Sequence, residues 1–355
     1  MRWNHDRRIP MKVAILFNSS SHLLDDRLMS IGKILARLLE GHEVFAHPRY
    51  GAMYVPFAKA VPVSGAGLGS GTHNAQGGAY KDCLRSAVLD FLTDASSPDL
   101  FITIGGDGLA AYVADALIAA IPMERRPSML GVAAGTANVG PIVSFRAEQL
   151  NGLSLSDFIK IPVDAVEVLD GGRHVAYAFN DVVLGDTLLA TVGGETRNIS
   201  VEQLVKYDRR EVVRPGTRIA ADDFKVFRSG KEVSFASPCD PGDIRQIVAS
   251  TLQFDRLYGR AVLGGLCVAG VSGLAAVGLC DRVVVDSDPS NWNYQGFTGT
   301  RHLVFCAGED IVLTGLGPDA QIVVDGNPYL RTQDSVTFRS VSQAVSIFRT
   351  KGEGA

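Results

Sequence analysis

The stretch DLFITIGGDGLAAYVADAL, Asp99–Leu117, decides the fold of this chain. An apolar run, Leu100–Ile104, ends in the tetrapeptide Gly105–Gly108, and an Ala-rich segment with helical spacing follows. A buried strand, a glycine turn and a helix in this order are typical of a parallel α/β sheet, in which ligands bind at the carboxyl ends of the strands. The tetrapeptide holds one carboxylate, Asp107, among three glycines, and its chemical task is the central question.

Segments on both sides of this stretch repeat the alternation. Lys12–Asn18 predicts a buried strand that ends in a polar turn, and apolar residues at spacings of three and four then predict a helix over Leu24–Leu38. Ser128–Pro141 predicts another strand followed by a glycine turn. The N-terminal part is therefore expected to be a parallel α/β, Rossmann-like sheet with helices on its faces.

The pattern changes near residue 160. Two strand-like runs flank the turn Asp170–Gly172, and short strand-like runs with frequent turns continue to the C-terminus. We expect two domains, an α/β domain over residues 11–155 and a β-rich, β-sandwich domain over residues 156–355. The end of the chain is expected to return to the first domain.

Composition narrows the classes of protein. The 355 residues carry a net charge of −4, so no basic surface for nucleic acid is predicted. The five cysteines form no Cys-x-x-Cys pair, which predicts reduced thiols in a cytoplasmic protein. Ala261–Cys280 has no charged residue and is long enough to span a bilayer, but its five glycines favour buried strands joined by turns over membrane insertion.

Glycines in the Gly105–Gly108 turn let a ligand approach the backbone, and free N–H groups at a helix start attract phosphate. A carboxylate there repels phosphate unless it has another task, such as accepting a proton from an attacking hydroxyl or holding Mg²⁺. The structural alternative is an Asx turn or an N-cap. From these four residues alone, both interpretations of Asp107 remain open.

Three further places bear on the question. Gly135–Gly140 is a second glycine turn after a second strand, or an ordinary β–α turn capped by Asn138. Asn180 and Asp181 form a polar pair inside an apolar run, suited to a sugar diol or to a strand end. The dipeptide Asp325–Gly326 is typical of a hairpin turn. No P-loop, Gly-x-Ser-x-Gly or His-x-x-x-His pattern occurs.

The order of these motifs resembles the NAD kinase and diacylglycerol kinase superfamily. Gly-Gly-Asp-Gly, a Gly-Thr-x-Asn turn, Asn-Asp within FNDVV and Asp-Gly within VDG follow one another as in that superfamily. The chain is most similar to its ATP-NAD kinase-like members, which include the acetoin-catabolism protein X type. The resemblance covers roughly Lys12 to Phe348.

The resemblance implies an NAD kinase-like fold, with the site between a Rossmann-like and a β-rich domain, and a kinase that uses ATP and Mg²⁺. It implies Asp107 as the catalytic carboxylate, and Asn180 and Asp181 as contacts to a small-molecule acceptor, with NAD as the first candidate. A homo-oligomer is also implied. The residues it places near the ATP phosphates are Gly105, Gly106, Gly108, Gly135, Thr136 and Asn138, and Asp325 and Asn18 are further candidates.

Two departures from the family keep other functions open. Leu109 stands where the family usually has a hydroxyl residue, and the Thr-Gly-Ser-Thr-Ala-Tyr stretch of the NAD pocket has no counterpart. The alternatives are a diacylglycerol-type lipid kinase and a non-catalytic nucleotide-binding regulatory protein. The sequence does not distinguish ATP from polyphosphate as donor, and the metal ligands are unknown.

Overall fold

A computed structural model describes residues 10–17, 25–47, 54–62, 78–95, 97–134, 140–234, 243–254, 270–288 and 299–351. Its helices are α1 (Asp25–Leu38), α3 (Gly78–Asp94), α4 (Asp107–Ala120) and α5 (Val201–Tyr207), with short 3₁₀ turns η1 (Met123–Arg125), η2 (Ala147–Leu150) and η3 (Leu155–Asp157). Among the described residues, no helix combines the length and the apolar character needed to cross a membrane.

The strands in chain order are β1 (Lys12–Phe17), β2 (Glu43–Ala46), β3 (Lys59–Ala60), β4 (Leu100–Gly105), β5 (Ser128–Ala133), β6 (Val143–Arg146), β7 (Phe158–Asp170), β8 (Arg173–Ala178), β9 (Val182–Gly185), β10 (Thr187–Val192), β11 (Glu195–Ser200), β12 (Ala220–Arg228), β13 (Lys231–Glu232), β14 (Gln246–Thr251), β15 (Leu274–Cys280), β16 (Thr300–Cys306), β17 (Asp310–Leu316), β18 (Gln321–Val324), β19 (Asn327–Tyr329) and β20 (Val336–Thr350).

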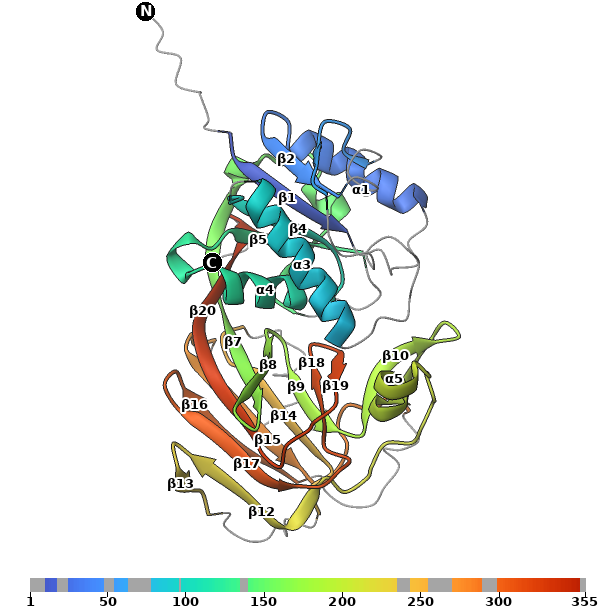
Figure 1. The fold of residues 1–355 in the computed structure, drawn as a ribbon, viewed down its shortest axis with the longest axis vertical. Coiled ribbons are helices and arrows are strands. Elements are labelled where there is room, and N and C mark those ends of the chain that lie inside the picture. Colours follow the sequence, from blue (N-terminus) through green and yellow to red (C-terminus); the bar gives the residue numbers. More distant parts are fainter. Residues whose placement is uncertain are drawn as a thin grey trace, which may run out of the picture.

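The N-terminal part is an α/β unit built on the parallel strands β3-β2-β1-β4-β5-β6. Alternate residues of its strands face opposite sides. Ile102 packs with α1 in one core, whereas Phe101 packs with α3 and α4 in another. Helices therefore cover both faces of the sheet (Figure 1). The predicted Rossmann-like class is confirmed.

The C-terminal part is a β-rich unit made of two large sheets and the two-stranded sheet β10-β11. The six-stranded sheet β16-β15-β14-β9-β18-β19 is antiparallel and packs through one apolar core against β7, β8, β12, β17 and β20. The predicted β-rich sandwich is confirmed. The second half of the apolar segment Ala261–Cys280 forms the buried strand β15, as expected, and its first half lies outside the described residues.

Two long strands join the units. β7 and β20 pair antiparallel from Val336–Asp170 to Thr350–Phe158. Near its end, β20 also pairs with β5 of the α/β unit, Ile347 beside Met129. These two strands run from one unit into the other (Figure 1). The expected short strands are thus wrong here, because two continuous strands of one sheet extend through both units. The short helix α5 was not expected.

Candidate functional site

The glycine turn lies where β4 meets α4. β4 ends at Gly105, the extended Gly106 precedes the helix, and Asp107 is its first residue. The backbone N–H groups in the first turn of a helix have no acceptor within the helix. In α4 no capping side chain accepts a hydrogen bond from them either. The N-cap interpretation of Asp107 is therefore wrong, since Gly106 occupies that position.

Asp107 instead bonds to the end of the second glycine turn. The backbone N–H of Gly140 donates to Oδ2 of Asp107 over 3.0 Å. A Cβ atom at Gly140 would lie 3.0 Å from Oδ1 of Asp107 and 3.6 Å from Cβ of Asn180. A glycine at this position thus allows the α/β unit's carboxylate and the β-rich unit's Asn180 to approach each other.

Asp325 organises the Asn180–Asp181 pair, which lies between β8 and β9. Its carboxylate accepts hydrogen bonds from the backbone N–H groups of Phe179, Asn180 and Asp181 at 2.9, 2.9 and 3.0 Å. Asp325 and Gly326 have φ angles of 47° and 76° and form the two-residue turn between β18 and β19. The dipeptide is therefore a hairpin turn, as predicted. The Asp325 side chain also holds the Asn180–Asp181 segment, which was predicted to contact the acceptor.

The carboxyl groups of this site affect one another's protonation. Burial, and then the charges of Asp325 and Asp107, raise the pKa of Asp181 to about 8. Burial raises the pKa of Asp325 to about 7, against its three N–H bonds, and the charge of Asp107 adds to the rise. Because Asp325 has donors that favour its ionised form, Asp181 is the group that carries a proton at neutral pH.

β19 contacts the first turn of α4. The side-chain amide of Asn327 donates to the carbonyl oxygen of Gly108 over 3.4 Å. A Cβ atom at Gly108 would lie 2.7 Å from Oδ1 of Asn327, so a larger residue here would displace the Asn327 side chain. The hairpin thus touches both the start of α4 and the Asn180–Asp181 segment.

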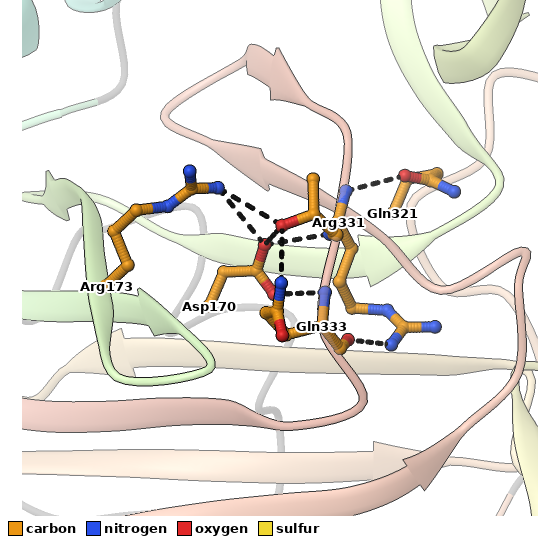
Figure 2. Close-up of polar contacts among 6 residues, drawn as sticks. Asp170, Arg173, Gln321, Arg331 and Gln333 are labelled. Atoms are coloured by element: carbon orange, nitrogen blue, oxygen red, sulfur yellow. Dashed lines mark hydrogen bonds and ion pairs between the residues drawn. The ribbon is translucent and has the colours of Figure 1, made fainter.

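The hairpin that carries Asp325 is anchored at its other end by Asp170, the last residue of β7 (Figure 2). The fully buried Asp170 carboxylate accepts hydrogen bonds from Thr332, through its N–H at 2.8 Å and its hydroxyl at 2.7 Å, and from the N–H of Gln333 at 3.0 Å. The guanidinium of Arg331 donates to the carbonyl oxygens of Leu316 and Ala320. These contacts fix the segment that follows β19.

The structure brings several sequence-predicted residues together: Gly105, Gly106, Asp107, Gly108, Asn180, Asp181 and Asp325. Gly135, Thr136, Asn138 and Asn18 lie outside the described residues. Leu109 is buried in the core beneath α4.

Sequence reasoning missed the contacts of Gly140 and Asn327. Gly140 closes the GTANVG stretch that had been singled out, so a signal existed for it. Asn327 follows an ordinary hairpin turn and carried none.

Comparisons with known proteins address the fold. No model of a known protein family matches the chain, and no curated protein sequence matches it. Among solved structures, yeast NADH kinase in complex with NADH is similar at a TM-score of 0.51 and 13% identity, covering 96% of this chain and 83% of that one. A diacylglycerol kinase from Bacillus anthracis strain Sterne is similar at 0.51 and 14% identity, covering 96% and 98%.

The chain has the fold of these two kinases. The NAD kinase-like, two-part architecture expected from the motif order is thereby confirmed. Within this kinase-type fold, Asp107 comes from the α/β unit and Asp181 and Asp325 from the β-rich unit. The closer likeness to the acetoin-catabolism protein X type stays a prediction.

Proposed function

We propose that the protein is an ATP- and Mg²⁺-dependent kinase that phosphorylates a hydroxyl group of a small polar molecule, with NAD as the first candidate acceptor. The observation that carries the proposal is the meeting of Asp107, on a glycine turn at a helix start, with the buried Asn180–Asp181 segment. The kinase-type fold supports it.

Asp107 would orient the acceptor hydroxyl and take its proton. Its Oδ2 is held by the Gly140 N–H, which fixes the orientation of the carboxyl group. The uncapped start of α4 supplies backbone donors for the phosphates, and Gly106 lets them come close. Phosphoryl transfer depends mainly on such positioning and on charge stabilisation.

Mg²⁺ fits the charge of this group of residues. The charge of Asp107 raises the pKa of both Asp181 and Asp325, and the charge of Asp325 raises that of Asp181, so the site favours an added positive charge. The described residues include no cluster of three His, Cys, Asp or Glu side chains that could hold a metal alone. Mg²⁺ in such sites commonly binds one or two carboxylates together with substrate phosphates and water, and Asp107 would serve in that way. The ion would offset charge on the transferred phosphoryl group.

The acceptor is proposed to be polar because of the groups that would face it. Asn180 offers an amide, and protonated Asp181 offers a hydrogen-bond donor as well as an acceptor. Such a pair suits vicinal hydroxyl groups, as in a ribose. It is poorly suited to an apolar acyl chain, since buried polar groups would then lose their partners.

The test is ADP release from the purified protein with ATP and Mg²⁺, with and without NAD. Asp107→Asn is expected to lower turnover by about 100-fold or more, because the amide cannot take the proton. Asp94→Asn, an exposed carboxylate at the end of α3, is the matched control and is expected to keep full turnover.

Three other outcomes would redirect the proposal. Full turnover in Asp107→Asn would remove this carboxylate from the mechanism. Turnover with diacylglycerol vesicles and with no polar acceptor would favour the lipid kinase. Binding of ATP without ADP release on a panel of sugars, nucleosides, polyols and lipids would favour the non-catalytic regulatory protein.

A further inference from the structure

One face of α4 is attached to the β-rich unit at three successive turns. Gly108, Tyr112 and Asp115 are spaced i, i+4 and i+7, so they lie on one side of the helix. Gly108 receives the amide of Asn327, and Tyr112 hydrogen-bonds the side chain of Tyr329. Both partners lie on β19, next to the turn that carries the Asp325 carboxylate.

The third attachment is His174 on β8. Its Nε2 lies 2.8 Å from Oδ1 of Asp115, and its Nδ1 lies 3.0 Å from Oε1 of Glu167 on β7. An ionised carboxylate only accepts hydrogen bonds, and a neutral imidazole has a single N–H. A protonated ring would donate to both carboxylates at once and so bridge α4 and β7.

The contact with His174 matters because Asp115 is buried. Its side chain is buried, with 4% of the residue exposed, and a buried carboxylate needs a paired charge. His174 is exposed, with 35% of its side-chain surface accessible, and the centroid of the Tyr177 ring lies 4.7 Å from that of its imidazole. Arg339 of β20 approaches the far carboxylate, Glu167, at 3.8 Å. His174 thus contacts the buried Asp115 carboxylate from the β-rich unit.

The far end of α4 is held separately. Arg126, which follows η1, donates to the carbonyl oxygen of Ile121 at 3.0 Å and to that of Ala344 on β20. Its charge also lies close enough to Tyr177 to affect the pKa of that phenol. The C-terminal end of α4 thus keeps its place on β20 without His174, and the contact at Asp115 acts on the rest of the helix together with those of Gly108 and Tyr112.

We infer that His174 is a positioning residue for Asp107, acting through Asp115 and the rigid α4 helix. Asp107 and Asp115 are separated by about 12 Å along the helix axis. Rotation of the helix at Asp115 would therefore move the Asp107 carboxylate relative to Asn180 and Asp181. The expected effect on kcat rests on the proposed kinase function. The expected effect on the position of α4 rests on the contacts alone.

The kinetic test compares His174→Ala with His302→Ala, a half-buried histidine on β16 that serves as the matched control. His174→Ala is expected to lower kcat roughly tenfold, because the Asp107 carboxylate would be misplaced relative to the acceptor. His174→Gln, which can still donate to Asp115, is expected to recover part of kcat. Equal kcat in wild type and His174→Ala would overturn the inference.

A second readout does not depend on turnover. Amide hydrogen exchange over residues 107–120 is expected to become about fivefold faster in His174→Ala and to stay unchanged in His302→Ala. If the wild type releases no ADP with any acceptor, the proposed function fails and this measurement alone decides the inference. Unchanged exchange in His174→Ala would overturn it, whatever the kinetics.

Discussion

Asp107, Asp181 and Asp325 reach one small region from three distant parts of the chain. Three backbone N–H groups stabilise the ionised form of Asp325. Burial and the neighbouring carboxylates favour the protonated form of Asp181. The pKa of Asp325 is therefore raised less than that of Asp181, because the number of donors differs. At this scale the residue types were readable from the sequence, but their charges were not.

The pH dependence of stability is expected to follow from Asp181. Its pKa of about 8 lies above that of an unfolded aspartate, so the native state holds a proton that the unfolded chain has lost. Between about pH 4 and 8 the free energy of unfolding therefore falls as pH rises, with a limiting slope of about 1.4 kcal/mol per pH unit for one proton. Asp181→Asn is expected to remove this contribution and to flatten the curve.

Urea unfolding at several pH values between 4 and 8 measures this effect. Asp222→Asn, whose side chain is 95% exposed, is the control and is expected to follow the wild-type curve. Identical slopes for Asp181→Asn and the wild type would contradict a proton on Asp181.

At the scale of elements, the β18–β19 hairpin links the two halves of the site. Its turn supplies Asp325, its second strand supplies Asn327, and its base is held by Asp170. The sequence predicted the turn from the dipeptide Asp325–Gly326, which readily adopts positive φ. In the structure both residues do so. The sequence did not indicate that Asp325 would contact Asn180 or that Asn327 would contact Gly108. Both contacts depend on which strands lie next to β18.

The anchor of the hairpin gives a stability prediction. Asp170→Ala is expected to lower the free energy of unfolding by about 3 kcal/mol, since three donors on residues 332 and 333 lose a buried carboxylate. Arg173→Ala, whose side chain is 70% exposed and 3.8 Å from the same carboxylate, is expected to cost about 0.5 kcal/mol or less. Chemical denaturation measures both, and equal losses would show that the anchor depends on the ion pair.

At the scale of the whole molecule, β7 and β20 make the two units share one sheet. β20 pairs with β17 and β7 in the β-rich unit and reaches β5 in the α/β unit. Disrupting either core therefore disturbs strands that belong to both. The separation at residues 155 and 156 and the homo-oligomer remain predictions from the sequence.

Unfolding is expected to be a single transition for this reason. Phe101→Ala in the α/β core and Phe338→Ala in the β-rich core each remove a fully buried ring, at a cost of about 3–5 kcal/mol. Differential scanning calorimetry should show one peak that moves to lower temperature in both variants. Two peaks, of which each variant moves only one, would contradict the coupling through β7 and β20.

The sequence by itself determined the local features of this protein. Apolar runs, glycine turns and helical spacing are properties of neighbouring residues, so they predicted the strand and helix that flank Asp107 and the turn at Asp325. Tertiary structure alone decided that Asp325 holds Asp181, 144 residues earlier, and that His174 bridges Asp115 and Glu167. Such contacts depend on strand order and on the register of β7, β8 and β18, which no periodicity within a segment encodes.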